Sequence, residues 1–441
     1  MESISKEAPP SYFQLVLLGL FLSVLVFVVL TVSAFYLYKH QVFNQENIIF
    51  DADPYYRSFA FAEGWGERSL MHPNLSNYVN PFVRVGERML RPFVPSVSPG
   101  ELRMRLSLGI SPLFAALTTA LIFWLARHAR VETARALAIA ALFGFSMSTV
   151  AFGSVPDHFL ISAFFCALGV LFVQIDGRLN SCLRFAVWTL LVSAAAGITI
   201  SNAVPLLALV GVAEWLNKSS WIGAARNMFF AGLAAGVLTV LSWAALNLMY
   251  GDFSSVQADQ AYKRNVGRVM FYISDNPLRD FVSFPITMGR AFWAGTPDVD
   301  KNPPYPNPDI AKYKVAFGYR PPLKQPILYS LLQLIPFAFI LFSLAFVLMQ
   351  RREDSMALVL PVAVFLLFNW LLHSVWGGGA EVFLFSPHWH FASVLALVPL
   401  ALACSSRIWT TLFVGGSVVV ASLNLFVWYD ALTLLPTLAS R

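Results

Sequence analysis

Long apolar segments alternate with polar connections along most of this chain. A helix that crosses a bilayer needs about 20 consecutive, mainly apolar residues. On this basis we predict eleven membrane helices, the sixth of which is the shortest, at 12–38, 106–126, 134–153, 158–175, 183–200, 203–216, 227–250, 326–349, 356–374, 389–405 and 408–428. Two connections are much longer than the others, 39–105 and 251–325. The pattern predicts an all-α membrane protein: residues 1–441 form a single polytopic bundle of about eleven transmembrane helices, and its two long loops bear juxtamembrane helices.

Basic residues in the short connections orient this bundle. Lys and Arg are enriched in cytoplasmic loops, and short loops report orientation better than long ones. In this chain they gather in alternate short connections, at Arg127, Arg130, Arg135, Arg178, Arg184, Lys218, Arg226, Arg351, Arg352 and Arg407. All of them lie on one side of the membrane if the N-terminus lies there too. We therefore predict a cytoplasmic N-terminus and place both long loops outside.

The composition supports a membrane protein and argues against other classes. Hydrophobic residues make up 57% of the chain and charged residues 12%, whereas soluble domains carry roughly 25% charged residues. The net charge of +6 forms no basic stripe with interleaved aromatic residues, so we predict no nucleic-acid partner. The three cysteines lie in or beside apolar segments and in no CxxC or Cys/His spacing, which argues against a disulfide framework or a zinc site.

Two carboxylates, Asp51 and Asp53, open the first long loop. Acidic side chains close to a bilayer are costly and usually functional. Asp53 precedes Pro54, and an Asp before a first-turn proline is a helix-start pattern, so Asp53 has a structural explanation as a cap. Asp51 has no such local explanation. Either carboxylate can accept a proton from an acceptor hydroxyl as a general base, or help to bind a divalent cation.

Three further polar residues fall in connections on the same predicted side. His72 precedes Pro73, which favours an extended backbone, and can either contact a phosphate or be an ordinary loop histidine. Asp157 begins the fourth predicted helix after a tight turn, where it is either a cap or a functional carboxylate. Arg57 lies one helical turn after Asp53, and arginine is suited to bidentate phosphate contact.

A glycine-rich stretch, 377–390, forms the outer turn between the ninth and tenth predicted helices. Three glycines give a permissive backbone, and Glu381, His388 and His390 then alternate with aromatic residues. A flexible turn that leads into an amphipathic wall suits a lipid-linked substrate. The same stretch also fits an interfacial aromatic belt, in which Phe and Trp lie at headgroup depth.

The second long loop divides into two parts. Residues 256–293 mix apolar and basic side chains and predict amphipathic helices on the membrane surface, whereas the proline-rich 297–326 should be irregular. The second part is either a lid over an outer cavity or a simple connector. No internal repeat is visible in the sequence, which argues against a transporter built from inverted repeats.

The arrangement of one helix, a long acidic outer loop and several polar outer turns resembles the GT-C superfamily of integral-membrane glycosyltransferases. The resemblance is carried by four short stretches: 51–57 (Asp-Ala-Asp-Pro-Tyr-Tyr-Arg), 72–73 (His-Pro), 155–157 (Val-Pro-Asp) and 381–389 (Glu-Val-Phe-Leu-Phe-Ser-Pro-His-Trp). It is most similar to the bacterial branch related to protein O-mannosyltransferases and to the aminoarabinose transferases of lipid A. The chain lacks the adjacent Asp-Glu pair of the protein mannosyltransferases.

The resemblance implies a transferase that takes a sugar from a polyprenyl-phosphate donor and adds it to an acceptor hydroxyl on the outer face. It implies Asp51 or Asp53 as the catalytic base, and Arg57, His72, Asp157, Glu381 and His388 are our substrate-binding residues. Direct displacement with one base predicts inversion at the anomeric carbon. The predicted partners are the lipid-linked donor, a lipid-linked, glycan or protein acceptor, and membrane lipids.

The expected location is the bacterial inner membrane, with the active site on its periplasmic or extracellular side. No cofactor is required by this chemistry; the Asp51/Asp53 spacing permits a divalent cation without demanding one, and we favour none. The alternatives are a transporter or flippase for a lipid-linked saccharide, and a non-catalytic scaffold. A flippase should place polar residues along the membrane midplane, whereas the acids of this chain collect at one predicted face.

Overall fold

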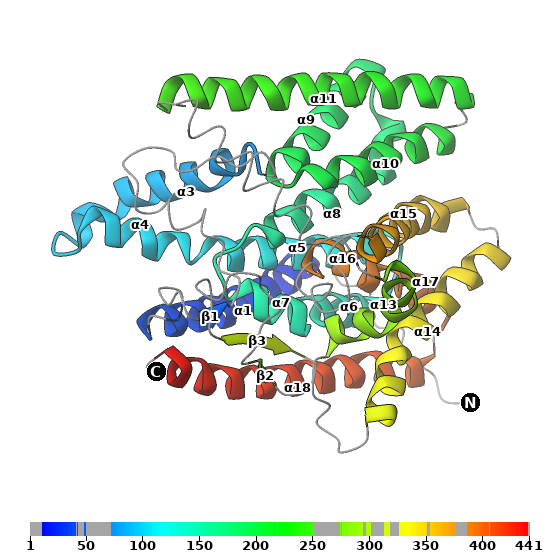
Figure 1. Cartoon of the computed structure of the whole chain (residues 1–441). Helices are drawn as coiled ribbons and strands as arrows, with labels where there is room; N and C mark the ends of the chain where they lie inside the picture. Colours follow the sequence, from blue (N-terminus) through cyan, green and yellow to red (C-terminus); the bar gives the residue numbers. More distant parts are fainter. Residues whose placement is uncertain are drawn as a thin grey trace.

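The computed structural model describes most of the chain. The described residues are 11–40, 42, 48–49, 72–217, 219–250, 274, 276–293, 297–300, 313–317, 326–350, 353–375, 386–404 and 406–439. Within them the chain forms a helical bundle with one small sheet, drawn in Figure 1. The predicted all-α class is confirmed.

The first half of the chain supplies most of the interior. Its elements are α1 (Tyr12–Lys39), α3 (Leu75–Leu90), η2 (Arg91–Phe93), α4 (Pro99–Ser107), α5 (Ile110–His128), α6 (Thr133–Gly144), α7 (Met147–Gly153), α8 (Phe159–Ile175), η3 (Asp176–Arg178), α9 (Ser181–Ile198), η4 (Ile200–Asn202), α10 (Ala203–Leu216) and α11 (Trp221–Tyr250).

The second half adds α13 (Pro277–Phe292), α14 (Pro326–Gln350), α15 (Glu353–Val375), α16 (Pro387–Leu395), α17 (Val398–Ala403) and α18 (Arg407–Ala439). Together the two halves place helices on all eleven predicted ranges.

Several of these helices begin at a side chain that caps them. Ser11 forms a capping box with Gln14 at the start of α1. Ser98 directly precedes the proline that opens α4, and its hydroxyl accepts from the main-chain N–H of Glu101. Ser146 caps α7, and the break at this serine bends α7 by 52° from α6. The predicted helix 134–153 is therefore a bent pair.

Seven helices of the described part are long and apolar enough to cross a membrane, and the bent α6–α7 pair makes eight. Three shorter apolar helices, Ile200–Leu216, Leu331–Val347 and Pro387–Ala403, fall on the remaining predicted ranges. The chain is thus a multi-pass membrane protein, and the count of eleven crossings stays a prediction.

Burial separates the central helices from the lipid-facing ones. The apolar window of the Pro99–His128 span is 72% buried and that of Phe159–Arg178 is 67% buried, whereas α11 and α18 are each only 17% buried over theirs. Figure 1 shows α11 and α18 along opposite sides of the molecule, with α5 and α8 between them. Exposed apolar faces on the outermost helices are expected when lipid is the solvent.

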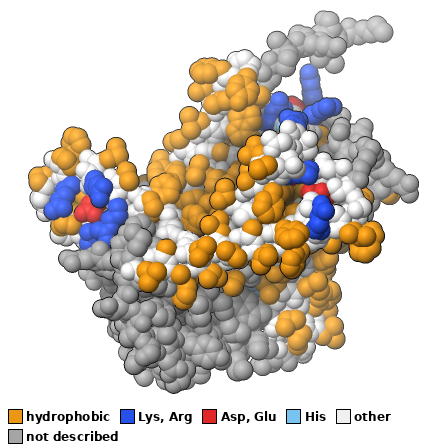
Figure 2. All heavy atoms as spheres, turned by 90° about the horizontal axis from the view of Figure 1, so that it is seen from above, with side chains coloured by type: hydrophobic (Ala, Val, Ile, Leu, Met, Phe, Trp, Pro, Cys, Tyr) orange, Lys and Arg blue, Asp and Glu red, His pale blue; other side chains and the backbone are white. Residues whose placement is uncertain are grey.

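The surface has the charge distribution of a membrane protein. In Figure 2 basic side chains gather at two separated ends of the visible face, and a mainly apolar region lies between them. The group at the left lies where Figure 1 places α3 and α4. In α3, η2 and α4, the side chains of Arg84, Arg91, Arg103 and Arg105 lie around Glu87 and Glu101.

The helix α13 differs from the prediction for its segment. The sequence predicts an amphipathic surface helix, but α13 packs against α14 and α15 and buries Phe284, Met288 and Phe292. Its apolar face therefore contacts protein. Close packing is possible because Gly289 lies against the main chain of Gln333 on α14, where a Cβ would collide with the Gln333 carbonyl.

A small sheet joins the two long loops, and the sequence did not predict it. Its order is β1-β3-β2, with β1 (Ile48–Ile49) parallel to β3 (Tyr313–Phe317) and β2 (Pro297–Asp300) antiparallel to β3. The register pairs Ile48 with Tyr313 and Pro297 with Phe317. The sheet brings the start of the first long loop beside a segment predicted to be irregular.

Candidate functional site

Polar residues from three separate connections meet where helices of the bundle end. His72 precedes α3, Asp157 and His158 precede α8, and His388 lies in the first turn of α16. The ring centroids of His72 and His158 are 4.0 Å apart, and those of His158 and His388 are 5.7 Å apart. We call these four residues the outer histidine cluster, because the sequence predicts that their connections lie on the outer side of the membrane. Sequence analysis predicted three of them, His72, Asp157 and His388, to lie on one side of the membrane.

The end of α9 holds the segment that carries His72. His72 Nδ1 donates to the main-chain carbonyl of Ile198 at 2.6 Å, and the main-chain N–H of Asn74 donates to the carbonyl of Gly197 at 2.8 Å. A Cβ on Gly197 would lie 2.9 Å from the Cβ of Asn74, so only glycine allows this approach. The neutral His72 ring is therefore the Nδ1–H tautomer, whose Nε2 carries the lone pair.

Asp157 lies one residue before His158, the N-cap residue of α8, and its carboxylate orients an imidazole. One carboxylate oxygen, Oδ1, accepts from the main-chain N–H of Phe159 at 3.3 Å and lies 2.9 Å from His158 Nδ1. Only 2% of the Asp157 surface is exposed. A buried carboxylate that accepts from one imidazole nitrogen selects the tautomer and fixes the ring plane.

The main chain of Asp157 is held from α5. The hydroxyl of Ser111 donates to the Asp157 carbonyl at 2.9 Å and accepts from the Asp157 N–H at 3.1 Å. One serine therefore satisfies both main-chain groups of a buried residue. This contact fixes the turn before α8 against the most buried membrane span.

His388 is positioned from the other side of the cluster. The hydroxyls of Ser386 and Ser148 are 2.7 Å apart, which ties the start of α16 to α7. The rings of His388 and Phe159 are 4.8 Å apart. Only 7% of the His388 surface is exposed, so its ring is almost entirely buried at the start of α16.

Four predicted site residues, Asp51, Asp53, Arg57 and Glu381, lie outside the described residues. The chain reaches Asp51 two residues after β1 ends at Ile49. Within the described part, no group of three or more His, Cys, Asp or Glu side chains is arranged to hold a metal ion.

Sequence reasoning missed two contributors to the cluster. His158 was passed over, although it directly follows Asp157 in the same outer turn and that adjacency was visible. Ser111 could not be found from sequence, because it is an ordinary polar residue 46 positions before Asp157 and meets it only through packing.

Comparison with known proteins gives only weak likenesses to solved structures. No family model matches the chain, and no curated protein matches it. Among solved structures, the chain is similar to the apo crystal structure of the Archaeoglobus fulgidus oligosaccharyltransferase, with a TM-score of 0.44 and 13% sequence identity. The match covers 94% of this chain and 56% of that one, so this chain spans little more than half of its length. A similarity of this size assigns neither a family nor an activity.

Proposed function

We propose that this protein is a GT-C-like integral-membrane glycosyltransferase that moves a sugar from a polyprenyl-phosphate donor to an acceptor hydroxyl on the outer membrane face. The observation that carries the proposal is the outer histidine cluster. Three connections that are distant in sequence bring His72, His158 and His388 together at one end of a membrane bundle, beside a buried carboxylate. A scaffold has no need of such a convergence.

The cluster suits the phosphate of a lipid-linked donor. The donor's chain stays in the bilayer and its phosphate lies at headgroup depth. When the sugar leaves, negative charge grows on the phosphate oxygen, and preorganised hydrogen-bond donors stabilise that charge. His72 and His158 already donate through Nδ1, so each ring donates to a phosphate oxygen through Nε2 only when Nε2 also carries a proton. Rings held in this way can bind phosphate oxygens as imidazolium ions without reorganising, and His388 is buried beside them.

In this proposal Asp51 or Asp53 activates the acceptor. A carboxylate removes the proton from the acceptor hydroxyl, and the acceptor oxygen attacks the anomeric carbon. The bond between that carbon and the phosphate oxygen breaks, and its electron pair leaves with the polyprenyl phosphate. A single displacement inverts the configuration at the anomeric carbon.

The small sheet supports a role for both loops in this chemistry. It pairs β1, which directly precedes the Asp51–Asp53 segment, with β3 of the second loop. Arg57 and Glu381 complete the proposed substrate contacts. We place the reaction on the periplasmic or extracellular side of a bacterial inner membrane, with a lipid-linked, glycan or protein acceptor.

The proposal is tested with purified protein in lipid nanodiscs. Polyprenyl phosphates that carry different radiolabelled sugars are supplied with extracts of membrane glycolipids, glycans and envelope proteins. We expect one donor to lose its label to an acceptor and to release polyprenyl phosphate, with inverted configuration in the product. A retained configuration would contradict the single displacement.

A parallel assay in vesicles separates the transferase from a flippase. The same labelled donors are placed in the inner leaflet, and their appearance in the outer leaflet is followed. The flippase alternative is supported if the protein moves a donor between leaflets and transfers no sugar. Sugar transfer without accelerated movement supports the glycosyltransferase.

A further inference from the structure

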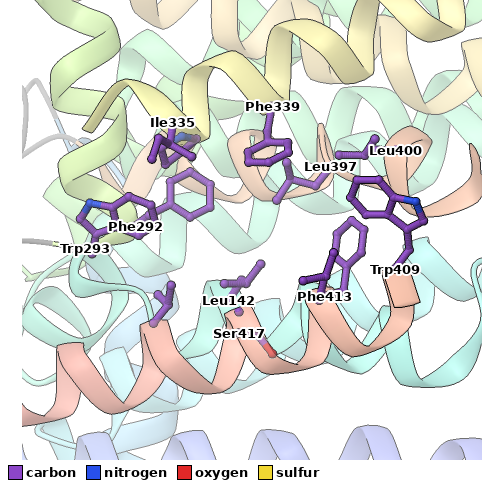
Figure 3. Close-up of a pocket in the computed structure, with 14 residues that line it drawn as sticks. Leu142, Phe292, Trp293, Ile335, Phe339, Leu397, Leu400, Trp409, Phe413 and Ser417 are labelled. Atoms are coloured by element: carbon purple, nitrogen blue, oxygen red, sulfur yellow. The ribbon is translucent and has the colours of Figure 1, made fainter. Parts of the chain in front are cut away.

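An apolar slot lies between α14 and α18, away from the outer histidine cluster. Its cavity volume is about 190 Å³, and α6, α17 and the end of α13 close its inner side. Figure 3 shows Trp293 and Trp409 at its two ends, with Phe339 and Phe413 between them. Ser417 contributes the one hydroxyl among the lining side chains. We call this cavity the α14–α18 slot.

The slot runs along the direction in which α18 crosses the membrane. Trp409 lies two residues after Arg407, at the predicted cytoplasmic start of α18, whereas Trp293 directly follows α13 on the side of the small sheet. A long occupant of the slot therefore lies roughly parallel to lipid chains.

The slot is accessible from the bilayer. Four of its large apolar lining residues, Ile335, Phe339, Trp409 and Leu412, are also exposed on the surface of the bundle, Leu412 most at 56% and Phe339 next at 44%. A closed apolar cavity of about 150 Å³ is large enough for benzene. A cavity slightly larger and open on one side accommodates part of one hydrocarbon chain, whose remainder stays in lipid.

We propose that the α14–α18 slot binds the isoprenoid chain of the lipid-linked donor; this inference rests on the proposed function. The slot has room for one chain. A polyprenyl phosphate has one chain, whereas a bilayer phospholipid has two and would leave its second chain outside.

The slot is also adjacent to the helix that supplies the site. Phe292 lines the slot, and its ring centroid is 4.6 Å from that of His390, two residues after His388 on α16. The slot and the outer histidine cluster thus flank the same helix. A donor held by its chain in the slot keeps its headgroup near the outer end of α16.

We expect the slot to increase the affinity of the protein for the lipid-linked donor only modestly. Lipid tails are as apolar as the slot, so binding removes no surface from water and depends on packing. We expect loss of the slot to weaken donor binding by about tenfold, the size of effect that a few van der Waals contacts supply.

Two adjacent glycines provide a matched pair of variants. A Cβ built at Gly415 or at Gly416 meets nothing within 4 Å, so neither substitution creates a clash there. Gly416 lines the slot and Gly415 does not. Gly416→Phe therefore fills the slot, and Gly415→Phe adds the same side chain outside it. The smaller Gly416→Leu should give a smaller effect, and equal thermal unfolding temperatures confirm that all three variants fold.

The probe is a polyprenyl phosphate with a photoreactive group in its chain, used with the full-length protein in nanodiscs. We expect crosslinks on α14 and α18 in the wild type and in Gly415→Phe, and about tenfold fewer in Gly416→Phe. With sugar-loaded donor, Gly416→Phe should raise KM and leave kcat unchanged. Equal labelling of both phenylalanine variants would overturn the inference, as would equal labelling of the slot by a photoreactive phospholipid.

Labelling requires no sugar transfer, so the two proposals fail separately. If the wild type transfers sugar but Gly416→Phe is crosslinked as strongly as the wild type, the slot proposal is contradicted and the proposed function is not. If the slot is labelled specifically and no sugar is transferred, the glycosyltransferase proposal fails while chain binding is supported.

Discussion

Two histidines two positions apart on α16 lie in opposite environments. His388 belongs to the outer histidine cluster, with other imidazoles and a carboxylate nearby. His390 is fully buried, stacks on Phe143 and contacts Phe292, and neither ring nitrogen has a hydrogen-bond partner among the described residues. The same residue type thus acts as a polar group at position 388 and packs as an apolar ring at position 390. Residue type alone therefore does not identify a site residue here.

The two regions are also held together differently. The cluster depends on a few hydrogen bonds with defined geometry, such as Ser111 to Asp157 and His72 to Ile198. The interior around His390 and the α14–α18 slot depends on many weak apolar contacts. Single substitutions should therefore have large effects in the cluster and small ones in the interior.

The largest difference should come from replacing each histidine by phenylalanine. His388→Phe removes a proposed phosphate contact, and loss of one such donor typically costs about 10²-fold in kcat. His390→Phe should leave sugar transfer within about twofold of the wild type, because no polar contact is lost. Transfer rates of the two variants under saturating donor provide the measurement, and equal loss in both would remove the distinction between the two environments.

Asp157 tests whether the cluster needs a negative charge or only a hydrogen-bond acceptor. The side-chain oxygen of Asn can accept from the same groups, whereas Ala removes the acceptor that Asp157 provides for the Phe159 N–H and for His158 Nδ1. We expect Asp157→Asn to keep stability within about 1 kcal/mol and lose about tenfold in transfer. Asp157→Ala should cost about 2–4 kcal/mol in unfolding free energy as well.

Thermal unfolding together with single-turnover transfer separates these two effects. If Asp157→Asn is fully active, the side chain acts only as a hydrogen-bond acceptor and its charge contributes nothing further.

Ser111 tests the support of the cluster from α5. Ser111→Ala leaves the buried N–H and C=O of Asp157 without their partner, which should destabilise the protein by about 2 kcal/mol. Thr118→Val on the same helix is the matched control, because the Thr118 hydroxyl donates only to the carbonyl of Phe114 within its own helix. The difference in unfolding temperature between these two variants gives the result, and equal values would mean that the Ser111 contacts add nothing.

The smallest expected effect is the change in thermal stability caused by His390→Phe. Replacing a buried polar ring without hydrogen bonds by an apolar ring removes a desolvation cost of about 1–3 kcal/mol, part of which is offset by the slightly larger ring. The variant should therefore unfold at the same or a higher temperature than the wild type. A clear loss of stability would indicate that His390 has a polar partner.

Much of the helical framework was predictable because its cause is local. The predicted range 12–38 corresponds to Tyr12–Lys39, and 356–374 lies within Glu353–Val375. A continuous apolar segment of membrane length determines such a helix without reference to the rest of the chain. The convergence of His72, Asp157 and His388 was predictable in the same way, because counting helices places alternate connections on one side.

The remaining features depend on contacts between distant segments. The sheet pairs Ile48 with Tyr313, and the proline content around β2 and β3 indicated irregular structure instead. The burial of α13 depends on the closeness that Gly289 allows to α14. The slot forms from five helices, and no single segment reveals it. Packing determines these features, and hydropathy does not report packing.

The central claim is that a carboxylate of the first loop activates the acceptor above the outer histidine cluster. It is tested most directly by transfer assays on Asp51→Asn and Asp53→Asn, with Asp430→Asn, near the end of α18, as a folded control. We predict that one of the two first-loop variants loses about 10²–10⁴-fold in kcat while donor binding and thermal unfolding stay unchanged. Undiminished transfer by both folded variants would contradict the account.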